Sequence, residues 1–294
     1  MLNGMPAQER GHTVTLHSSP QQPEHPQIPK FHRSHPINPA LSPRQNNPVR
    51  PPMPADRPLS GRVALVTGAG RGIGRATALR LASLGAAVIC VARSRDEIEA
   101  CATEAGPAAA AIPCDITAPN AAQTLVETAQ ARFGRLDILV LSSGAFHSGT
   151  ITETDSAAFG KLFTVNVGAP LELIRTALPM LRVSKGQIAV VNSTIIRAAN
   201  TAGRGLYAAT QTALKSLTDT LRDEINQDGI RVISIMPGTT ATPRQEAIYE
   251  TSGKPWRPEL LLQPEDVAAA LCGSLLLPKT AEATDIFVRP MQKF

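Results

Sequence analysis

The sequence predicts an α/β fold, a doubly wound parallel sheet of the Rossmann type with helices on both faces in three αβα layers. Two observations predict it. From Gly61 onward, short and nearly all-apolar runs alternate with longer runs of helical periodicity. This alternation is typical of successive right-handed βαβ units. A glycine-rich loop also separates the first apolar run from the first helical run, where such sheets carry an anion-binding turn.

Each element follows from its local pattern. The run 62–67 (RVALVT) is short and apolar, which suits a strand buried on both faces. Residues 73–84 have apolar side chains at helical spacing and form the first predicted helix. The same reasoning gives strands at 87–92, 109–113, 136–141, 187–192, 231–236 and 285–288, and helices at 95–105, 119–133, 156–182, 205–227 and 266–277. Pro170 is expected to bend the helix 156–182, and residues 239–263 are expected to be irregular.

Residues 1–60 differ in composition from the rest. They hold 13 of the 25 prolines and five of the six histidines of the 294-residue chain. Such a segment cannot bury enough apolar surface to offset its ordering entropy. We therefore expect a disordered tail over 1–60 and a single domain over 61–294. Translation from Met53 would remove most of the tail, whereas prolines at every third position over 20–29 are compatible with a polyproline II interaction segment.

Charge and hydropathy exclude several classes of function. The net charge is +5, but no run of five basic residues occurs and only 3% of the residues are aromatic, so a nucleic-acid partner is not indicated. The most apolar stretch, 267–277, is shorter than the roughly 20 residues of a membrane-spanning helix. No metal site is expected, because His32 and His35 lie in the proline-rich tail and the cysteines form no C-x-x-C pair. We expect a cytoplasmic protein that binds a small molecule.

The glycine loop reads Thr67-Gly68-Ala69-Gly70-Arg71-Gly72-Ile73-Gly74. Glycines at 68, 72 and 74 let the backbone turn tightly and approach a pyrophosphate. The helix that opens near Gly72 directs unpaired N–H groups and a partial positive charge at that anion. Because the loop follows a predicted buried strand and opens a helix, it predicts a dinucleotide site beyond the carboxyl ends of the strands.

The residues after the second strand indicate which dinucleotide binds. An NAD site usually has Asp or Glu about 20 residues after the loop, to hold the ribose 2′-hydroxyl. Here Ala92 ends the strand, Arg93 follows, and Arg71 lies in the loop. Two guanidinium groups without a carboxylate favour the 2′-phosphate of NADP(H). The alternative is that both arginines are solvated surface charges.

With these features the sequence resembles the short-chain dehydrogenase/reductase family from Gly61 to about Phe294. The T-G-x-x-x-G-x-G loop, Asn166 in V-N-V and Tyr207 in Y-A-A-T-Q match that family. The resemblance implies an NADP(H)-dependent oxidoreductase that acts on a carbonyl or alcohol substrate and forms a homodimer or homotetramer. The cofactor-binding residues that it implies are Gly68, Arg71, Gly72, Ile73, Gly74, Arg93, Asp115, Gly144, Tyr207, Gln211, Pro237, Gly238 and Thr242.

The sequence departs from the family at three places. Where the family often reads N-N-A-G after the fourth strand, this chain has L-S-S-G, and only Gly144 is kept. The catalytic hydroxyl expected 13 residues before Tyr207 falls on Thr194, with Ser193 beside it. The family motif Y-x-x-x-K ends here in Gln211. The catalytic residues that the resemblance implies are therefore Tyr207, Thr194, Asn166 and Gln211.

The glutamine at position 211 bears directly on mechanism. In the family, the lysine holds the nicotinamide ribose and lowers the pKa of the tyrosine that transfers the proton. Gln211 can still hydrogen-bond a ribose hydroxyl, but it carries no charge. An unperturbed tyrosine titrates near about pH 10, so we expect reduction to be impaired less than oxidation. Lys215 could replace the missing charge only if its side chain folded back by one turn. The alternative function is a catalytically silent NADP(H)-binding sensor or partner subunit.

Overall fold

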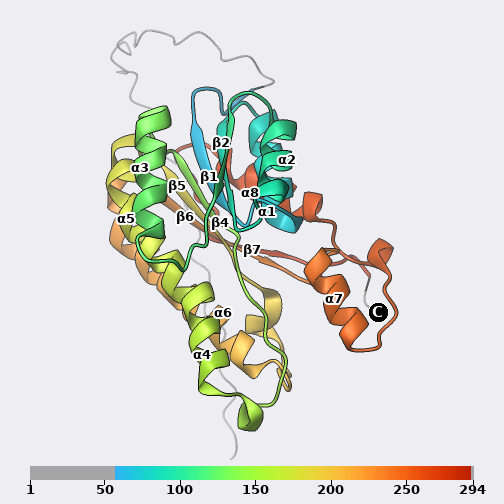
Figure 1. Ribbon diagram of the computed structural model, residues 1–294. Helices are drawn as coiled ribbons and strands as arrows, with labels where there is room; N and C mark the ends of the chain where they lie inside the picture. Colours follow the sequence, from blue (N-terminus) through green and yellow to red (C-terminus); the bar gives the residue numbers. More distant parts are fainter. Residues whose placement is uncertain (1–56, 293–294) are drawn as a thin grey trace, which may run out of the picture. The chain divides into compact units, whose positions relative to one another are not determined.

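The computed structural model describes residues 57–292, and within them seven parallel strands form one sheet in the order β3-β2-β1-β4-β5-β6-β7 (Figure 1). This arrangement confirms the predicted fold class. All seven predicted strands are found, and β4 begins two residues later than expected. The strands are β1 (Val63–Thr67), β2 (Ala87–Ala92), β3 (Ala109–Pro113), β4 (Ile138–Leu141), β5 (Gln187–Val191), β6 (Arg231–Pro237) and β7 (Asp285–Val288).

Helices cover both faces of the sheet and enclose two hydrophobic cores. One core lies between the sheet and α1 (Gly72–Ser83), α2 (Arg95–Ala105) and α8 (Pro264–Leu275). The other lies between the opposite face and α3 (Ala121–Phe133), α5 (Ala169–Ser184) and α6 (Gly205–Ile225). Alternate residues of each strand serve opposite cores because successive side chains of a strand point to opposite faces.

The prediction of one continuous α-helix over 156–182 is wrong in one respect. It is divided into α4 (Ser156–Phe163) and α5 by a π-helical turn over Thr164–Gly168. Pro170 lies in the first turn of α5, directly after this π turn, and has no N–H to donate to a carbonyl of the preceding turn. The π turn carries the buried Asn166 into the interior.

The segment 239–263, predicted to be irregular, contains the helix α7 (Pro243–Thr251). Its start has recognisable signals, since the Thr242 hydroxyl accepts a hydrogen bond from the Gln245 N–H at 3.2 Å and Pro243 follows the cap. Although every residue of α7 is described, none is buried. The helix therefore lacks the apolar periodicity on which the prediction depended.

The folded body begins before the predicted boundary at Gly61. The Leu59 side chain is buried in the core that contains α1, and its N–H donates to the Leu84 carbonyl at 2.9 Å. The rest of the predicted tail, residues 1–56, lies outside the described residues.

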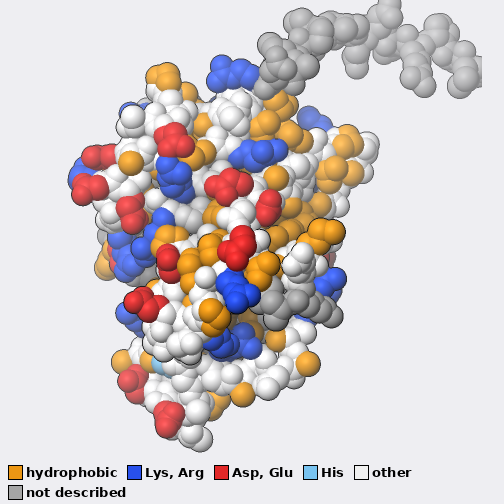
Figure 2. All heavy atoms as spheres, turned by 90° about the vertical axis from the view of Figure 1, so that its right-hand side faces the viewer, with side chains coloured by type: hydrophobic (Ala, Val, Ile, Leu, Met, Phe, Trp, Pro, Cys, Tyr) orange, Lys and Arg blue, Asp and Glu red, His pale blue; other side chains and the backbone are white. Residues whose placement is uncertain are grey.

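The surface of the body carries both signs of charge. On the face shown in Figure 2, basic and acidic side chains are interspersed among apolar ones. Within residues 57–292, none of the helices combines the length and the apolar character that crossing a bilayer requires.

A buried carboxylate joins the amino-terminal ends of the central strands. Asp137 accepts hydrogen bonds from the Val63 N–H at 2.9 Å and from the side chains of Arg62 and Arg135 at 2.7–2.8 Å. Burial by itself raises the pKa of Asp137, but the hydrogen bonds from Arg135, Arg62 and Val63 outweigh it and hold the pKa below its usual value. The ionised form is therefore the one that stabilises the fold.

We expect Asp137→Ala to lower the free energy of unfolding by about 2–4 kcal/mol, because it removes several charge-assisted hydrogen bonds at once. Urea unfolding measures the loss, and Asp223→Ala, at an exposed position of α6, should change stability little. Since the pKa of Asp137 is depressed in the folded state, its contribution is present above the unfolded value of about 3.9 and is lost as the pH falls through the lower folded value. A difference between wild type and variant that already shrinks between about pH 7 and 5 would contradict this account.

Candidate functional site

A cleft of about 1640 Å³ opens at the carboxyl ends of the strands, where the sheet order turns from β1 to β4. Ligand pockets usually measure roughly 300–1,000 Å³, so this cleft has room for an extended ligand together with a second, smaller molecule. Every site residue predicted from the sequence lines it, namely Gly68, Arg71, Gly72, Ile73, Gly74, Arg93, Asp115, Gly144, Asn166, Thr194, Tyr207, Gln211, Pro237, Gly238 and Thr242.

The glycine loop forms one end of the cleft and is built for close backbone approach. Gly68 and Gly72 have φ of +70° and +56°, which favours glycine. A Cβ at Gly74 would lie 2.2 Å from the Gly68 carbonyl oxygen. Within the described chain, the N-cap Arg71 makes no side-chain hydrogen bond to α1, and no acidic residue lies in its first turn. The first N–H groups of α1 are thus left for an external anion, which fits a bound pyrophosphate.

The residues predicted to determine the preference for NADP(H) or NAD(H) line one part of the cleft. Arg71 and Arg93 both line the cleft, and Thr117 hydrogen bonds, together with the charge of Arg93, hold the pKa of Asp115 below its usual value. As predicted, the strand ends at Ala92 without a carboxylate, but an acidic residue lies nearby on the next helix. Glu97 on α2 lines the same part of the cleft, with its Oε1 3.9 Å from Nη1 of Arg71. The sequence signal was the S-x-x-E spacing from Ser94, whose side chain caps α2.

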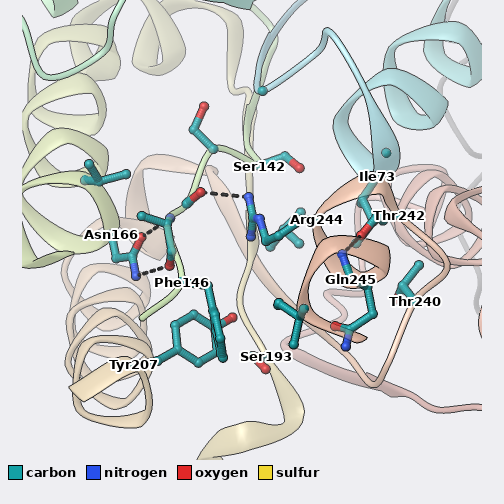
Figure 3. A pocket seen from close by; sticks show the side chains of 18 of the residues that line it. Ile73, Ser142, Phe146, Asn166, Ser193, Tyr207, Thr240, Thr242, Arg244 and Gln245 are labelled. Carbon is teal, nitrogen blue, oxygen red and sulfur yellow. Dashed lines mark hydrogen bonds between the residues drawn. The ribbon is translucent and has the colours of Figure 1, made fainter. Parts of the chain in front are cut away.

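Asn166 is fixed by three hydrogen bonds. Its Oδ1 accepts from the Ala145 N–H at 2.7 Å, and its Nδ2 donates to the Ala145 carbonyl and to the Thr210 hydroxyl, both at 3.0 Å (Figure 3). Thr210 in turn donates to the Tyr207 carbonyl at 2.8 Å. The π turn, the loop after β4 and helix α6 are therefore held together around one buried amide.

Tyr207 stands at the base of the cleft on the first turn of α6. Its ring packs edge-on against Phe146, with centroids 5.1 Å apart. Burial raises the pKa of Tyr207, whereas a hydrogen bond with the Ser193 side chain and the charge of Arg244 act in the opposite direction. Ser193 and Thr194, the residue that the 13-residue spacing selects, both bring a hydroxyl to the cleft that Tyr207 lines. Thr194 also lines the cleft, at the start of a 3₁₀ turn over Thr194–Arg197.

Gln211 keeps its place one helical turn after Tyr207. Its carbonyl oxygen accepts from Nδ2 of Asn192 at 3.0 Å, while its side-chain amide faces the cleft and makes no hydrogen bond with another described residue. Lys215 does not fold back toward Tyr207. Its Nζ lies 2.6 Å from Oδ1 of Asp219 and 3.0 Å from Oδ2 of Asp285.

Arg244 on α7 is a cleft residue that the sequence reasoning missed. Its Nη2 donates to the Gly144 carbonyl at 2.7 Å, so the side chain reaches from α7 to the loop after β4 (Figure 3). Although Arg244 is exposed, partial desolvation of its guanidinium in the cleft lowers its pKa, and its interaction with Tyr207 opposes that change. The missed signal was the helix start at Thr242, because a helix there places the second residue after the cap at the cleft.

These features are typical of a class, the Rossmann-type oxidoreductases, in which a glycine loop and a tyrosine share one cleft. Comparisons with known proteins agree. The family described as short chain dehydrogenase matches residues 62–253. An uncharacterized oxidoreductase of Staphylococcus aureus (strain MRSA252) is 33% identical over 235 residues, which cover 79% of this chain and 99% of the relative.

Two solved structures share the fold. An alcohol dehydrogenase from the archaeon Thermococcus sibiricus, complexed with 5-hydroxy-NADP, is similar with a TM-score of 0.70 and 28% identity, over 79% of this chain and 98% of that chain. A 3-ketoacyl-(acyl-carrier-protein) reductase from Brucella melitensis, complexed with NADH, is similar with a TM-score of 0.70 and 28% identity, over 78% and 97%. The chain belongs to the short-chain dehydrogenase/reductase family of oxidoreductases.

Proposed function

We propose that the protein is an NADP(H)-dependent oxidoreductase that interconverts a carbonyl compound and its alcohol. The observation that carries the proposal is the presence in one cleft of the glycine loop, the Tyr207 phenol and the Ser193 hydroxyl. The nicotinamide, when bound, supplies or accepts the hydride. The glycine loop and the start of α1 would hold its pyrophosphate, and Pro237, Gly238 and Thr242 would line its nicotinamide end.

Tyr207 acts as the proton donor in the direction of reduction. Because burial raises its pKa, the phenol keeps its proton at neutral pH and can transfer it to a substrate carbonyl oxygen. The Ser193 hydroxyl, with Thr194 next to it, orients that oxygen by hydrogen bonding. The Gln211 amide, which faces the cleft, can hold a ribose hydroxyl, and the fixed Asn166 keeps α6 and the loop after β4 in register.

A turnover screen of the purified protein with NADPH and a panel of ketones and aldehydes tests this function. Tyr207→Phe should abolish the turnover found, since it removes the proton but keeps the ring. Gln211→Lys should raise alcohol oxidation at about pH 7–8 by more than it raises ketone reduction, because only oxidation needs an ionised phenol. General acid–base groups contribute about 10²–10⁴-fold, so the change lies within the range of steady-state rates.

The outcomes of this screen separate the two functions that remain open. Turnover that depends on Tyr207 supports the oxidoreductase. If wild type and Gln211→Lys both bind NADPH yet turn over nothing across a broad panel, the protein is a silent sensor or partner subunit. That second function has one observation in its favour, the neutral side chain at position 211.

The preference for NADP(H) over NAD(H) follows from the charges around the predicted 2′-phosphate. Arg71 and Arg93 both line that part of the cleft, and Ala92 ends the strand where an NAD site has a carboxylate. Glu97 is the opposing charge, and its contact with Arg71 partly offsets it. The Thermococcus neighbour is complexed with an NADP derivative and the Brucella neighbour with NADH, so the proposed preference rests on the local charges.

Calorimetry should therefore show tighter binding of NADPH than of NADH. We expect Arg93→Ala to weaken NADPH binding about 10-fold or more, since a charge-assisted hydrogen bond contributes about 1.5–3 kcal/mol, and to leave NADH binding nearly unchanged. Glu97→Gln is the matched variant and should strengthen NADPH binding. Equal affinity of the wild type for both cofactors would end the argument for NADP(H).

We also propose a homodimer or homotetramer. Phe159 on α4, Leu171 on α5 and Leu217 on α6 are large apolar side chains that this single chain leaves exposed. In the family that the chain resembles, neighbouring helices pair between subunits, and a symmetric pairing would cover such side chains. Sedimentation equilibrium should give two or four times the mass of 31.1 kDa, and Leu217→Glu should reduce it. A monomeric wild type would contradict the proposal.

A further inference from the structure

We propose that Arg244, from helix α7, supplies beside Tyr207 the positive charge that the neutral Gln211 does not supply from helix α6. This inference rests on the proposed function only in taking Tyr207 as the group that transfers the proton. It assigns a further catalytic role to a residue outside the family's tyrosine–lysine motif.

The Arg244 guanidinium and the Tyr207 phenol contact the same loop, the one that follows β4. The Nη2 atom of Arg244 donates to the Gly144 carbonyl at 2.7 Å. The next residue, Ala145, is fixed on both its N–H and its carbonyl by Asn166. The residue after that, Phe146, packs its ring against Tyr207. Arg244 is thus anchored to the same rigid loop that forms one wall around the phenol (Figure 3).

The charge of Arg244 is not neutralised by a carboxylate. Among residues 57–292, no acidic oxygen lies within ion-pair distance of its guanidinium, although nine other basic residues form such pairs. The acidic residues that line the cleft are Glu97, which faces Arg71, and Asp115, which accepts from Thr117. Both stand at the glycine-loop end. The effect of Arg244 on Tyr207 is in the expected direction, since its charge lowers the pKa of the phenol.

Lys215, the cation of α6 two turns after Tyr207, does not supply this positive charge. Lys215 is engaged by Asp219 and Asp285 and does not line the cleft. Other charged or titratable groups on the elements around Tyr207 are exposed at the rim or turned elsewhere. They are Lys161 on α4, Arg204 before α6, Tyr249 on α7, Lys254 after it, His147, which contacts Thr154, and Arg197, which stacks on Phe287. Arg244 is exposed as well, and it differs from these groups because its hydrogen bond to the Gly144 carbonyl fixes the guanidinium on the loop whose Phe146 packs against Tyr207.

The role follows from the proton balance of reduction. A bound reduced cofactor would supply the hydride for the carbonyl carbon, and the carbonyl oxygen receives the proton of Tyr207, so that the product is the alcohol. The O–H bond of Tyr207 breaks and leaves a phenolate, which a proton from solvent restores. A fixed positive charge beside the phenol stabilises that phenolate as it forms and places the charge where it develops.

The test measures the phenol directly and needs no turnover. The chain has two tyrosines, Tyr207 and Tyr249, so in a Tyr249→Phe background the tyrosinate absorbance reports Tyr207 alone. We expect Arg244→Met to move its titration upward, because the variant removes a positive charge that lowers the pKa of the phenol. Arg244→Lys should move it less. The double variant Gln211→Lys/Arg244→Met should return it toward the wild-type value.

Lys161→Met is the matched control, because it removes another cation of the same cleft and should leave the titration unchanged. Melting temperatures verify that each variant folds. If Arg244→Met leaves the titration of Tyr207 unchanged, the proposal is overturned. This holds even if the variant binds NADPH more weakly, because Arg244 would then be a cofactor ligand. A shifted titration in a protein that turns over nothing would support this inference and contradict the proposed function alone.

Discussion

The absence of a side chain at Gly74 is the constraint on which the cleft depends. Helix α1 lies so close to the end of β1 that a Cβ at this position would be 2.2 Å from the Gly68 carbonyl oxygen. At the same strand end, the Thr67 hydroxyl accepts from the N–H groups of Ser142 and Ser143 at 3.1 and 3.2 Å. The loop after β4 is thereby positioned from the glycine loop, and it carries the contacts of Ala145 with Asn166 and of Phe146 with Tyr207.

The two sides of the cleft differ in how firmly the core holds them. Helix α6 spans Gly205–Ile225, buries six of its residues and carries Tyr207 and Gln211. Helix α7 buries none of its described residues and is fixed by its cap, by the Tyr249–Trp256 ring contact and by the reach of Arg244 to Gly144. The phenol that we propose as the proton donor thus stands on the side with the buried helix, and the charge that we propose to act on it stands on a helix held by few contacts. Mobile elements of enzymes are commonly of this second kind.

The sequence predicted the sheet and the cleft well, because both depend on short-range patterns. Apolar runs identified all seven strands, and every predicted site residue lines one cleft. Three errors have a common physical origin in helix starts and turns without an apolar stripe. Helix α7 has no buried face, so Arg244 was missed. The capping position of Glu97 and the π turn around Asn166 leave only weak local signals.

The π turn over Thr164–Gly168 also determines where this helical segment can change in length. A helix advances about 100° per residue, and a π turn accommodates one residue more than an α-helical turn does. Deleting a single residue there would return the turn to regular α geometry and would leave the outward-facing Phe159 of α4 on nearly the same side of the helix. A deletion within α4 itself would instead rotate the residues before it by about 100° relative to α5. The π turn is therefore the place in this helical segment where the chain length can change by one residue with the least effect on the directions of α4 and α5.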